Sequence, residues 1–181
     1  GQLAYYQHLA RQNELRLIGD AAALDRHIRR CTDPAAASGD WRVGCILMLE
    51  GADPIVEPTD IHTWWQQGLR MLSLAHYGHG RYACGTPSMD PASDEGDGPL
   101  TQRGLELLKE MNELSIALDL THTADASFFQ ALDRFEGAVC ATHANCRALA
   151  PTPRQLTNEQ IKLIAERGGV IGVAGHAGMI R

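Results

Sequence analysis

The feature of this sequence that most constrains its fold is a regular alternation of amphipathic segments with short apolar runs. The runs are rich in Val, Ile and Leu, as are strands buried on both faces of a sheet. The segments between them repeat their apolar residues at helical spacing. A repeated β-α-β order of this kind predicts a parallel sheet covered by helices. We expect six strands, over Leu15–Ile18, Val43–Leu49, Arg70–Ala75, Ile116–Thr121, Ala138–Thr142 and Val170–Ala174.

Local signals place the helices between these strands. Asp20 can cap a helix that runs to about Arg30, and Thr157 with Gln160 forms a capping box for the last helix. Gly, Pro, Ser and Asp are concentrated from residue 78 to residue 99, which predicts a long surface loop. The other helices are expected over Leu3–Asn13, over Asp60–Gln67, from Thr101 onward, and over Ala124–Phe135.

The length of the chain bounds the architecture. A chain of 181 residues has the size of one domain, whereas a closed barrel of eight β/α units needs roughly 250 residues. We therefore expect a single α/β domain over residues 1–181. It would be an incomplete (β/α)8 TIM barrel of about six β/α units, truncated at both ends.

Composition and charge narrow the class of partner. The formal net charge of −6 and the lack of a Lys/Arg cluster argue against a nucleic-acid partner. No run of about 18 apolar residues occurs, so we expect no transmembrane segment in this span. The five cysteines form an odd set without a C-x-x-C pair. This pattern argues against a disulfide framework and favours a reducing, cytoplasmic location.

Four of the predicted strands are followed by a polar side chain that an apolar strand does not itself need: Glu50, His76, His122 and His143. In a parallel α/β barrel the carboxyl ends of all strands lie on one rim, where active sites are built. Imidazole and carboxylate are ordinary zinc ligands, and a glutamate can bridge two ions about 3.5–4 Å apart. A single strand-end histidine is more often a hydrogen-bonded loop residue, but four such positions together predict a shared metal site.

Six segments, taken in order, resemble signatures of the membrane dipeptidase (renal dipeptidase) family of zinc metallopeptidases. They are Leu49–Ile55, Leu72–His76, Asp119–His122, Thr142–Leu149, Pro153–Leu156 and Gly168–Val173. The likeness spans nearly the whole chain. It implies an amidohydrolase-like barrel with a binuclear zinc centre, which hydrolyses dipeptides by a metal-bridged hydroxide.

The resemblance also implies a role for each candidate residue. Glu50 would be the bridging carboxylate, and His122 and His143 would ligate the second zinc. His76 would be the catalytic residue that stabilises the oxyanion beside the substrate carbonyl. Arg154 would bind the terminal carboxylate of the dipeptide, since a guanidinium can do so through two parallel hydrogen bonds. From the residues alone, Arg154 is better interpreted as a solvated loop arginine.

The chain also departs from the family pattern. No His-x-Asp pair for the first zinc precedes Gly1, and an acidic residue near the last strand would lie beyond Arg181. This span is therefore expected to supply three of five zinc ligands and to show negligible activity alone. Thr142 stands where the family often has Ser, and Ala75 where it often has Thr.

Two other functions stay open. One is a metal-dependent amidohydrolase that acts on another small amide, such as a lactam or an N-acyl amino acid. The other is a catalytically inactive barrel relative that binds small molecules. A homodimer also stays open as the assembly.

Overall fold

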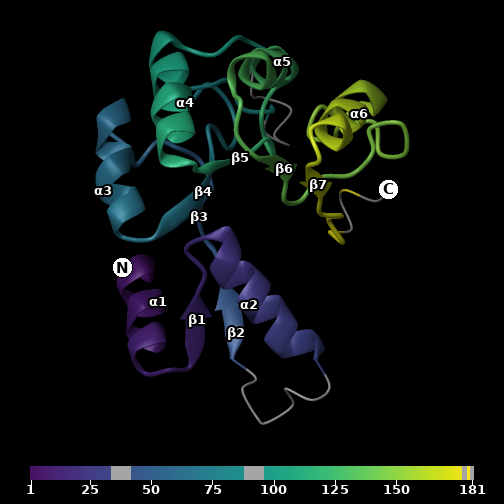
Figure 1. The fold of residues 1–181 in the computed structure, drawn as a ribbon. Helices are drawn as coiled ribbons and strands as arrows, with labels where there is room; N and C mark the ends of the chain where they lie inside the picture. The colour runs from purple at the N-terminus through teal and green to yellow at the C-terminus, as the bar shows by residue number, and fades with distance from the viewer. Residues whose placement is uncertain (34–41, 88–95, 177–178, 180–181) are drawn as a thin grey trace.

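The computed structural model describes residues 1–33, 42–87, 96–176 and 179, which form parallel strands joined by helices (Figure 1). In a two-stranded sheet, β1 (Leu15–Leu17) pairs with β2 (Val43–Cys45). A five-stranded sheet follows in the order β3 (Leu47–Leu49), β4 (Leu69–Ser73), β5 (Ala117–Asp119), β6 (Val139–Ala141) and β7 (Val170–Ile171). All these pairings are parallel, which confirms the predicted α/β class; closure into a barrel stays a prediction.

The helices alternate with the strands along the chain. They are α1 (Gln2–Arg11), α2 (Ala21–Thr32), α3 (Ile61–Gln66), α4 (Gln102–Leu114), α5 (Asp125–Arg134) and α6 (Asn158–Glu166), with a short 3-10 turn η2 (Pro58–Asp60) before α3. Two predicted caps are confirmed. The side chain of Asp20 accepts a hydrogen bond from the amide of Ala23, and Thr157 and Gln160 form the expected capping box.

The predicted strand over Val43–Leu49 is interrupted at Ile46, so the prediction of one strand here was wrong. Its first half pairs with β1, and its second half pairs with β4 starting from Leu47 opposite Leu69. The chain therefore changes partners within one apolar run, and seven short strands replace the six expected among the described residues. A continuous apolar pattern cannot show this change, because both halves consist of the same apolar residue types.

The core lies between the five-stranded sheet and the helices α3 to α6, which lie along its outer side in Figure 1. Leu107, Leu108 and Met111 on α4 are almost fully buried, as is Phe128 on α5. Their partners are the inward residues of β4 and β5, among them Leu72 and Leu118. Burying side chains of this size contributes roughly 1.5–3 kcal/mol each, so this interface fixes the strands from which the candidate residues project.

The predicted surface loop over residues 78–99 contains a buried stretch at residues 82–86. Tyr82 is 0% exposed, and Ala83, Cys84, Gly85 and Thr86 are buried behind it. Isolated bridges join this segment to Tyr77, His79 and Thr123, and the hydroxyl of Tyr82 donates to the carbonyl of Ile55 at 2.6 Å. The surface interpretation was wrong for residues 82–86, because Gly and Pro content reports turns and not exposure, whereas residues 79, 81, 96, 97 and 99 are exposed as expected. Residues 88–95 lie outside the described residues.

Two further expectations can be compared with the fold. Within the described ranges, no helix has both the length and the apolar composition that crossing a bilayer requires. None of the five cysteines, all of which lie in those ranges, forms a disulfide.

Candidate metal centre

Glu50 follows β3 directly, and its backbone leaves the sheet through a glycine. Gly51 has φ +89°, a conformation that favours glycine, and its amide donates a hydrogen bond to the buried hydroxyl of Ser73 at 2.7 Å. This contact ties the end of β3 to the end of β4. The Glu50 side chain is thereby directed over the carboxyl ends of the neighbouring strands, where its Oε1 atom approaches three imidazoles.

His122 lies three residues beyond β5 in an unusual backbone conformation. Its φ is +64°, in the left-handed region, and its carbonyl accepts a hydrogen bond from the amide of Thr86 at 2.7 Å. The imidazole is only 3% exposed, and the rings of His76 and Tyr77 lie 4.2 Å and 4.7 Å from it, centroid to centroid. Packing on several sides therefore holds this ring in place.

His143 lies two residues beyond β6, and its ring meets that of His122. The two Nε2 atoms are 3.2 Å apart, and Oε1 of Glu50 lies 2.9 Å from Nε2 of His143 and 3.2 Å from Nε2 of His122. The sequence places these residues on three different strands across almost a hundred positions. As expected from their strand-end positions, their candidate ligand atoms converge within 4.8 Å of one another.

The electrostatics of the cluster fit a bound cation. Burial, joined by the charges of Arg154, His76 and His143, lowers the pKa of His122 to about 3. At neutral pH this ring is therefore uncharged and can offer a lone pair, which is the form of imidazole that binds metal. Two imidazoles and a carboxylate that direct their acceptor atoms to one point are a donor set that suits zinc.

Asp119 and Thr142 support His143, and sequence reasoning assigned neither of them a role. The hydroxyl of Thr142 lies 2.8 Å from Nδ1 of His143 and donates to Oδ2 of Asp119 at 2.6 Å. Asp119 is 0% exposed and ends β5. An acidic residue at the buried end of an apolar strand was the available signal, because a buried carboxylate needs hydrogen-bond donors around it.

His76 lies at the edge of the cluster, three residues beyond β4. Its side chain is 49% exposed, and its Nε2 is 3.9 Å from Oε1 of Glu50. Its ring also packs against that of Tyr77 at 4.5 Å. The structure thus brings all four strand-end residues of the prediction to one place, with His76 the most open to solvent.

Arg154 is buried, so its interpretation as a solvated loop arginine was wrong. The residue is 5% exposed, and its Nη2 donates to the carbonyl of His143 at 2.9 Å and lies 3.2 Å from Nε2 of His122. Its Nε and Nη1 atoms are buried and have no hydrogen-bond partner among the described residues. A buried guanidinium with unused donors is costly unless an acceptor joins it, so the arrangement suits an anionic group.

Comparison with known proteins decides the family. The model of the membrane dipeptidase family (peptidase family M19) matches residues 7–181. The chain belongs to the membrane dipeptidase family. This confirms the resemblance that the six sequence segments indicated.

Individual relatives agree with this membership. An uncharacterised protein of Klebsiella pneumoniae is 30% identical over 173 residues, which cover 95% of this chain and 61% of the relative. The fold is similar to a crystal structure of a metallopeptidase from Rhodobacter sphaeroides bound to a phosphinate mimic of the dipeptide L-Ala-D-Ala. That match has a TM-score of 0.82 and 27% identity, and covers 100% of this chain and 49% of the other. A second M19 dipeptidase structure matches with a TM-score of 0.81 and 28% identity, and 50% of it is covered. The chain therefore spans about half the length of these solved relatives.

In this member of the dipeptidase family, a second arginine holds the loop that carries Arg154. Arg147 donates to the carbonyls of Pro153 and Gln155, on either side of Arg154, and forms a two-fold hydrogen bond with the carboxylate of Asp125, both contacts at 2.7 Å. The loop is thus tied to the first turn of α5. Sequence reasoning missed this contact because Arg147 and Asp125 are 22 positions apart.

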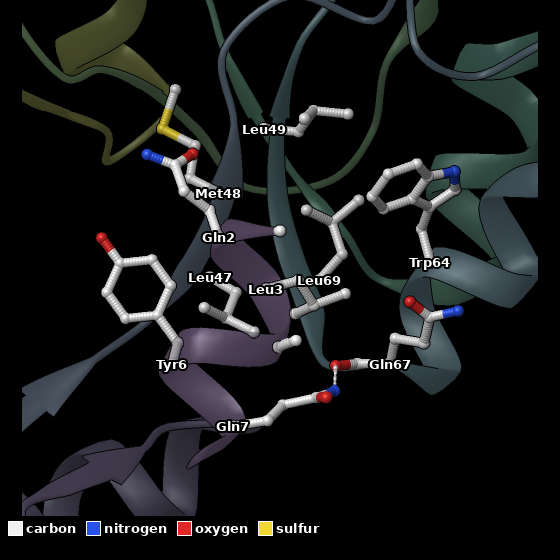
Figure 2. Close-up of a pocket in the computed structure, with 12 residues that line it drawn as sticks. Gln2, Leu3, Tyr6, Gln7, Leu47, Met48, Leu49, Trp64, Gln67 and Leu69 are labelled. Atoms are coloured by element: carbon white, nitrogen blue, oxygen red, sulfur yellow. Dashed lines mark hydrogen bonds between the residues drawn. The ribbon is translucent and has the colours of Figure 1, made fainter. Parts of the chain in front are cut away.

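This member of the dipeptidase family also contains an apolar cavity of about 490 Å³. Figure 2 shows it between α1 and the strands β3 and β4, with Leu3, Leu47, Leu69 and Trp64 on its walls. A hydrogen bond from Gln7 to the carbonyl of residue 67 lies at its edge. None of the candidate ligands lines this cavity, so it does not take part in the chemistry argued below.

Proposed function

We propose that this chain carries the metal-binding and substrate-binding part of a zinc-dependent dipeptidase. The observation that supports this most strongly is the meeting of two features at one point. The ligand atoms of Glu50, His122 and His143 converge, and the buried guanidinium of Arg154 lies beside them with unused donors. A metal site next to a carboxylate-binding arginine suits a small substrate with one hydrolysable bond and one free carboxylate.

Glu50, His122 and His143 would hold zinc. When bound, zinc would polarise the scissile carbonyl and lower the pKa of a water molecule toward neutrality. The family resemblance implies two ions, with Glu50 shared between them and a His-x-Asp pair on the other ion. The printed sequence contains no His-x-Asp pair, so the second ion is proposed for the whole protein.

The side chains of this chain would bind and orient the dipeptide. Arg154 would form charge-assisted hydrogen bonds with the terminal carboxylate, and these bonds would position the peptide bond over the cluster. His76, the most exposed of the four strand-end residues, would donate a hydrogen bond from its ring to the carbonyl oxygen as negative charge develops there. The relative bound to a mimic of L-Ala-D-Ala supports a dipeptide as the substrate class.

We further propose that residues 1–181 are one section of a (β/α)8 barrel. The five parallel strands in sequential order, with helices along their outer side, support this. In such a barrel the carboxyl ends of β3, β4, β5 and β6 would share one rim, which is where the four candidate residues lie. No second functional domain is needed to explain the described residues.

The test uses the intact protein with zinc and L-Ala-D-Ala. The variants Glu50→Gln and His143→Ala should each lose bound zinc and dipeptide hydrolysis together. The matched control is His62→Ala, since His62 is a partly exposed histidine on α3 that pairs with Glu110 far from the cluster. Hydrolysis is followed by the release of free alanine, and zinc by metal analysis of the purified protein.

Three results would contradict the proposal. Retention of zinc by Glu50→Gln and His143→Ala would remove the metal assignment. Zinc binding with hydrolysis of N-acyl amino acids or lactams, but not of dipeptides, would favour the other amidohydrolases. Binding of dipeptides without hydrolysis by the zinc-loaded protein would favour an inactive small-molecule-binding relative.

A further inference from the structure

The buried carboxylate of Asp119 is saturated with hydrogen-bond donors from two strands. Its Oδ1 accepts from the amide and hydroxyl of Thr121, at 3.1 Å and 2.7 Å, and from the amide of Thr142 at 2.9 Å. Its Oδ2 accepts from the hydroxyl of Thr142 at 2.6 Å. The carboxylate thus acts only as an acceptor, and each of its oxygens has a defined partner.

The hydroxyl of Thr142 lies between this carboxylate and an imidazole. A threonine hydroxyl has one proton to donate and can accept through its lone pairs. Because that proton is directed to Asp119, the hydroxyl can only accept from Nδ1 of His143, which lies 2.8 Å away. Its remaining contact, at 3.4 Å, is the hydroxyl of Thr121, whose own proton is also directed to Asp119. The ring of His143 must therefore carry its proton on Nδ1.

We propose that Asp119 and Thr142 are positioning residues that fix His143 as the Nδ1–H tautomer and so present the lone pair of Nε2 to the metal centre. This inference rests on the metal-binding role proposed for His143. Nε2 is the atom that lies 2.9 Å from Glu50 and 3.2 Å from Nε2 of His122, so its lone pair would share a bound cation with these two acceptor atoms. A ligand histidine commonly donates its other N–H to an acceptor that sets its basicity and direction.

The two candidate histidine ligands are held in different ways. Nδ1 of His122 is buried and has no hydrogen-bond partner among the described residues, and its ring is held by neighbouring rings and by Arg154. His143 is 37% exposed and packs against less, but it has the hydrogen-bonded chain behind it. The chain from Asp119 through Thr142 therefore compensates at His143 for packing that only His122 has.

The main test compares Thr142→Val with Thr142→Ser in the intact protein. Valine keeps the shape of threonine but lacks the hydroxyl, whereas serine keeps the hydroxyl. In the metal-free protein, ¹⁵N spectra of labelled histidine report which ring nitrogen carries the proton, and His143→Ala assigns the signal. Thr142→Val should lose the Nδ1–H state, and its zinc affinity should fall about 10- to 100-fold in competition with a chelator. Thr142→Ser should keep the Nδ1–H state and most of the affinity.

Asp119→Asn supplies a second, opposite perturbation. Its amide NH₂ would donate to the hydroxyl of Thr142, which would then donate its own proton to Nδ1 of His143. The ring proton should therefore move to Nε2, and zinc affinity should fall although every side chain keeps its shape. A merely structural role for Asp119 would not change the tautomer in this direction.

The inference would be overturned if Thr142→Val kept the Nδ1–H state and bound zinc as tightly as the wild type. It would equally be overturned if Thr142→Ser lost affinity as far as Thr142→Val, because the hydroxyl would then be irrelevant. Circular dichroism spectra show whether each variant is folded. The tautomer of His143 is measured without metal or substrate. Its result can therefore be interpreted even if the protein proves to lack the proposed dipeptidase activity.

Discussion

Replacing Arg154 by alanine tests the substrate assignment most directly. Two of the donors on this guanidinium contact His143 and His122, while Nε and Nη1 have no partner in the described part of the chain. Because the side chain is 5% exposed, a carboxylate bound to it would be shielded from water. Losing one partner of a buried, hydrogen-bonded charge pair costs roughly 2–5 kcal/mol. This corresponds to roughly a 30- to 4,000-fold loss of kcat/KM for a dipeptide.

The assay compares a dipeptide with the same dipeptide amidated at its C-terminus. The amidated substrate has no negative charge to pair with Arg154, and a neutral hydrogen bond is worth about 0.5–1.5 kcal/mol. Arg154→Ala should therefore slow the amidated substrate by no more than about tenfold. Arg134→Ala is a matched control, because Arg134 is an exposed arginine of α5 whose ion pair is with its exposed neighbour Asp133.

The ratio of the losses in kcat/KM on the two substrates decides whether Arg154 binds the substrate carboxylate. A large loss on the dipeptide with a small loss on the amide supports carboxylate binding. Equal losses on both substrates would refute the reasoning, since Arg154 would then act only by holding the carbonyl of His143 and the ring of His122. A normal rate on both would show that the buried guanidinium lies outside the substrate site.

Two predictions concern stability. Hydrogen bonding to Arg147 chiefly lowers the pKa of Asp125, with the charge of Arg147 and a hydrogen bond from Gln160 acting in the same direction and burial opposing them. A lowered pKa gives stability that is complete above the unfolded value near 3.9 and is lost as the pH falls through the folded value. The difference in unfolding free energy between wild type and Asp125→Asn should thus be constant from about pH 5 to 7, at about 1 kcal/mol for this partly exposed pair. Below about pH 4 the difference should shrink. A difference that grew in acid would contradict this assignment. Gly104→Ala should lower the free energy of unfolding measured in urea by about 1–3 kcal/mol, because a Cβ there would lie 2.0 Å from the carbonyl oxygen of Tyr82. The control Gly96→Ala should be nearly neutral, because a Cβ there has nothing within 4 Å. Equal effects of the two substitutions would show that α4 shifts freely.

The convergence of the strand-end residues was accessible from sequence for a simple physical reason. Parallel strands joined by helices all point the same way, so a residue just past each strand reaches the same edge of the sheet. Glu50, His122 and His143 needed only the strand pattern and the direction of the strands. The exact ends did not matter, since each residue lies within three positions of its strand.

The surroundings of these residues were not accessible in the same way. Arg154 lies in a loop whose carbonyls on both sides of it accept from Arg147, and Arg147 is itself paired with Asp125 of α5. Tyr82 is buried through bridges and a hydrogen bond to Ile55 that join distant segments. Long-range contacts of this kind leave no local period or composition in the sequence.

The break at Ile46 shows a third limit. Apolar residues on either side of it give one unbroken strand signal, but the backbone pairs with β1 on one side and with β4 on the other. The two halves are apolar alike although Val43 is 71% exposed and Leu47 only 8% exposed, and the pairing partner of each half depends on where β1 and β4 lie. The sequence pattern therefore predicts that this run is extended, but not how deeply each half is buried or that it belongs to two sheets.

The left-handed backbone at His122 has an evolutionary consequence. A side chain other than glycine in this conformation costs about 1 kcal/mol, and this residue also brings a buried, uncharged imidazole with an unused nitrogen. Glycine or asparagine would relieve the backbone cost without a ring to bury. Selection for thermal stability alone should therefore replace His122 early. A descendant that had lost its metal-dependent activity could become more stable by replacing His122 with glycine or asparagine. Persistence of histidine at this position in stabilised variants would then be a sign of selection on the site and not on the fold.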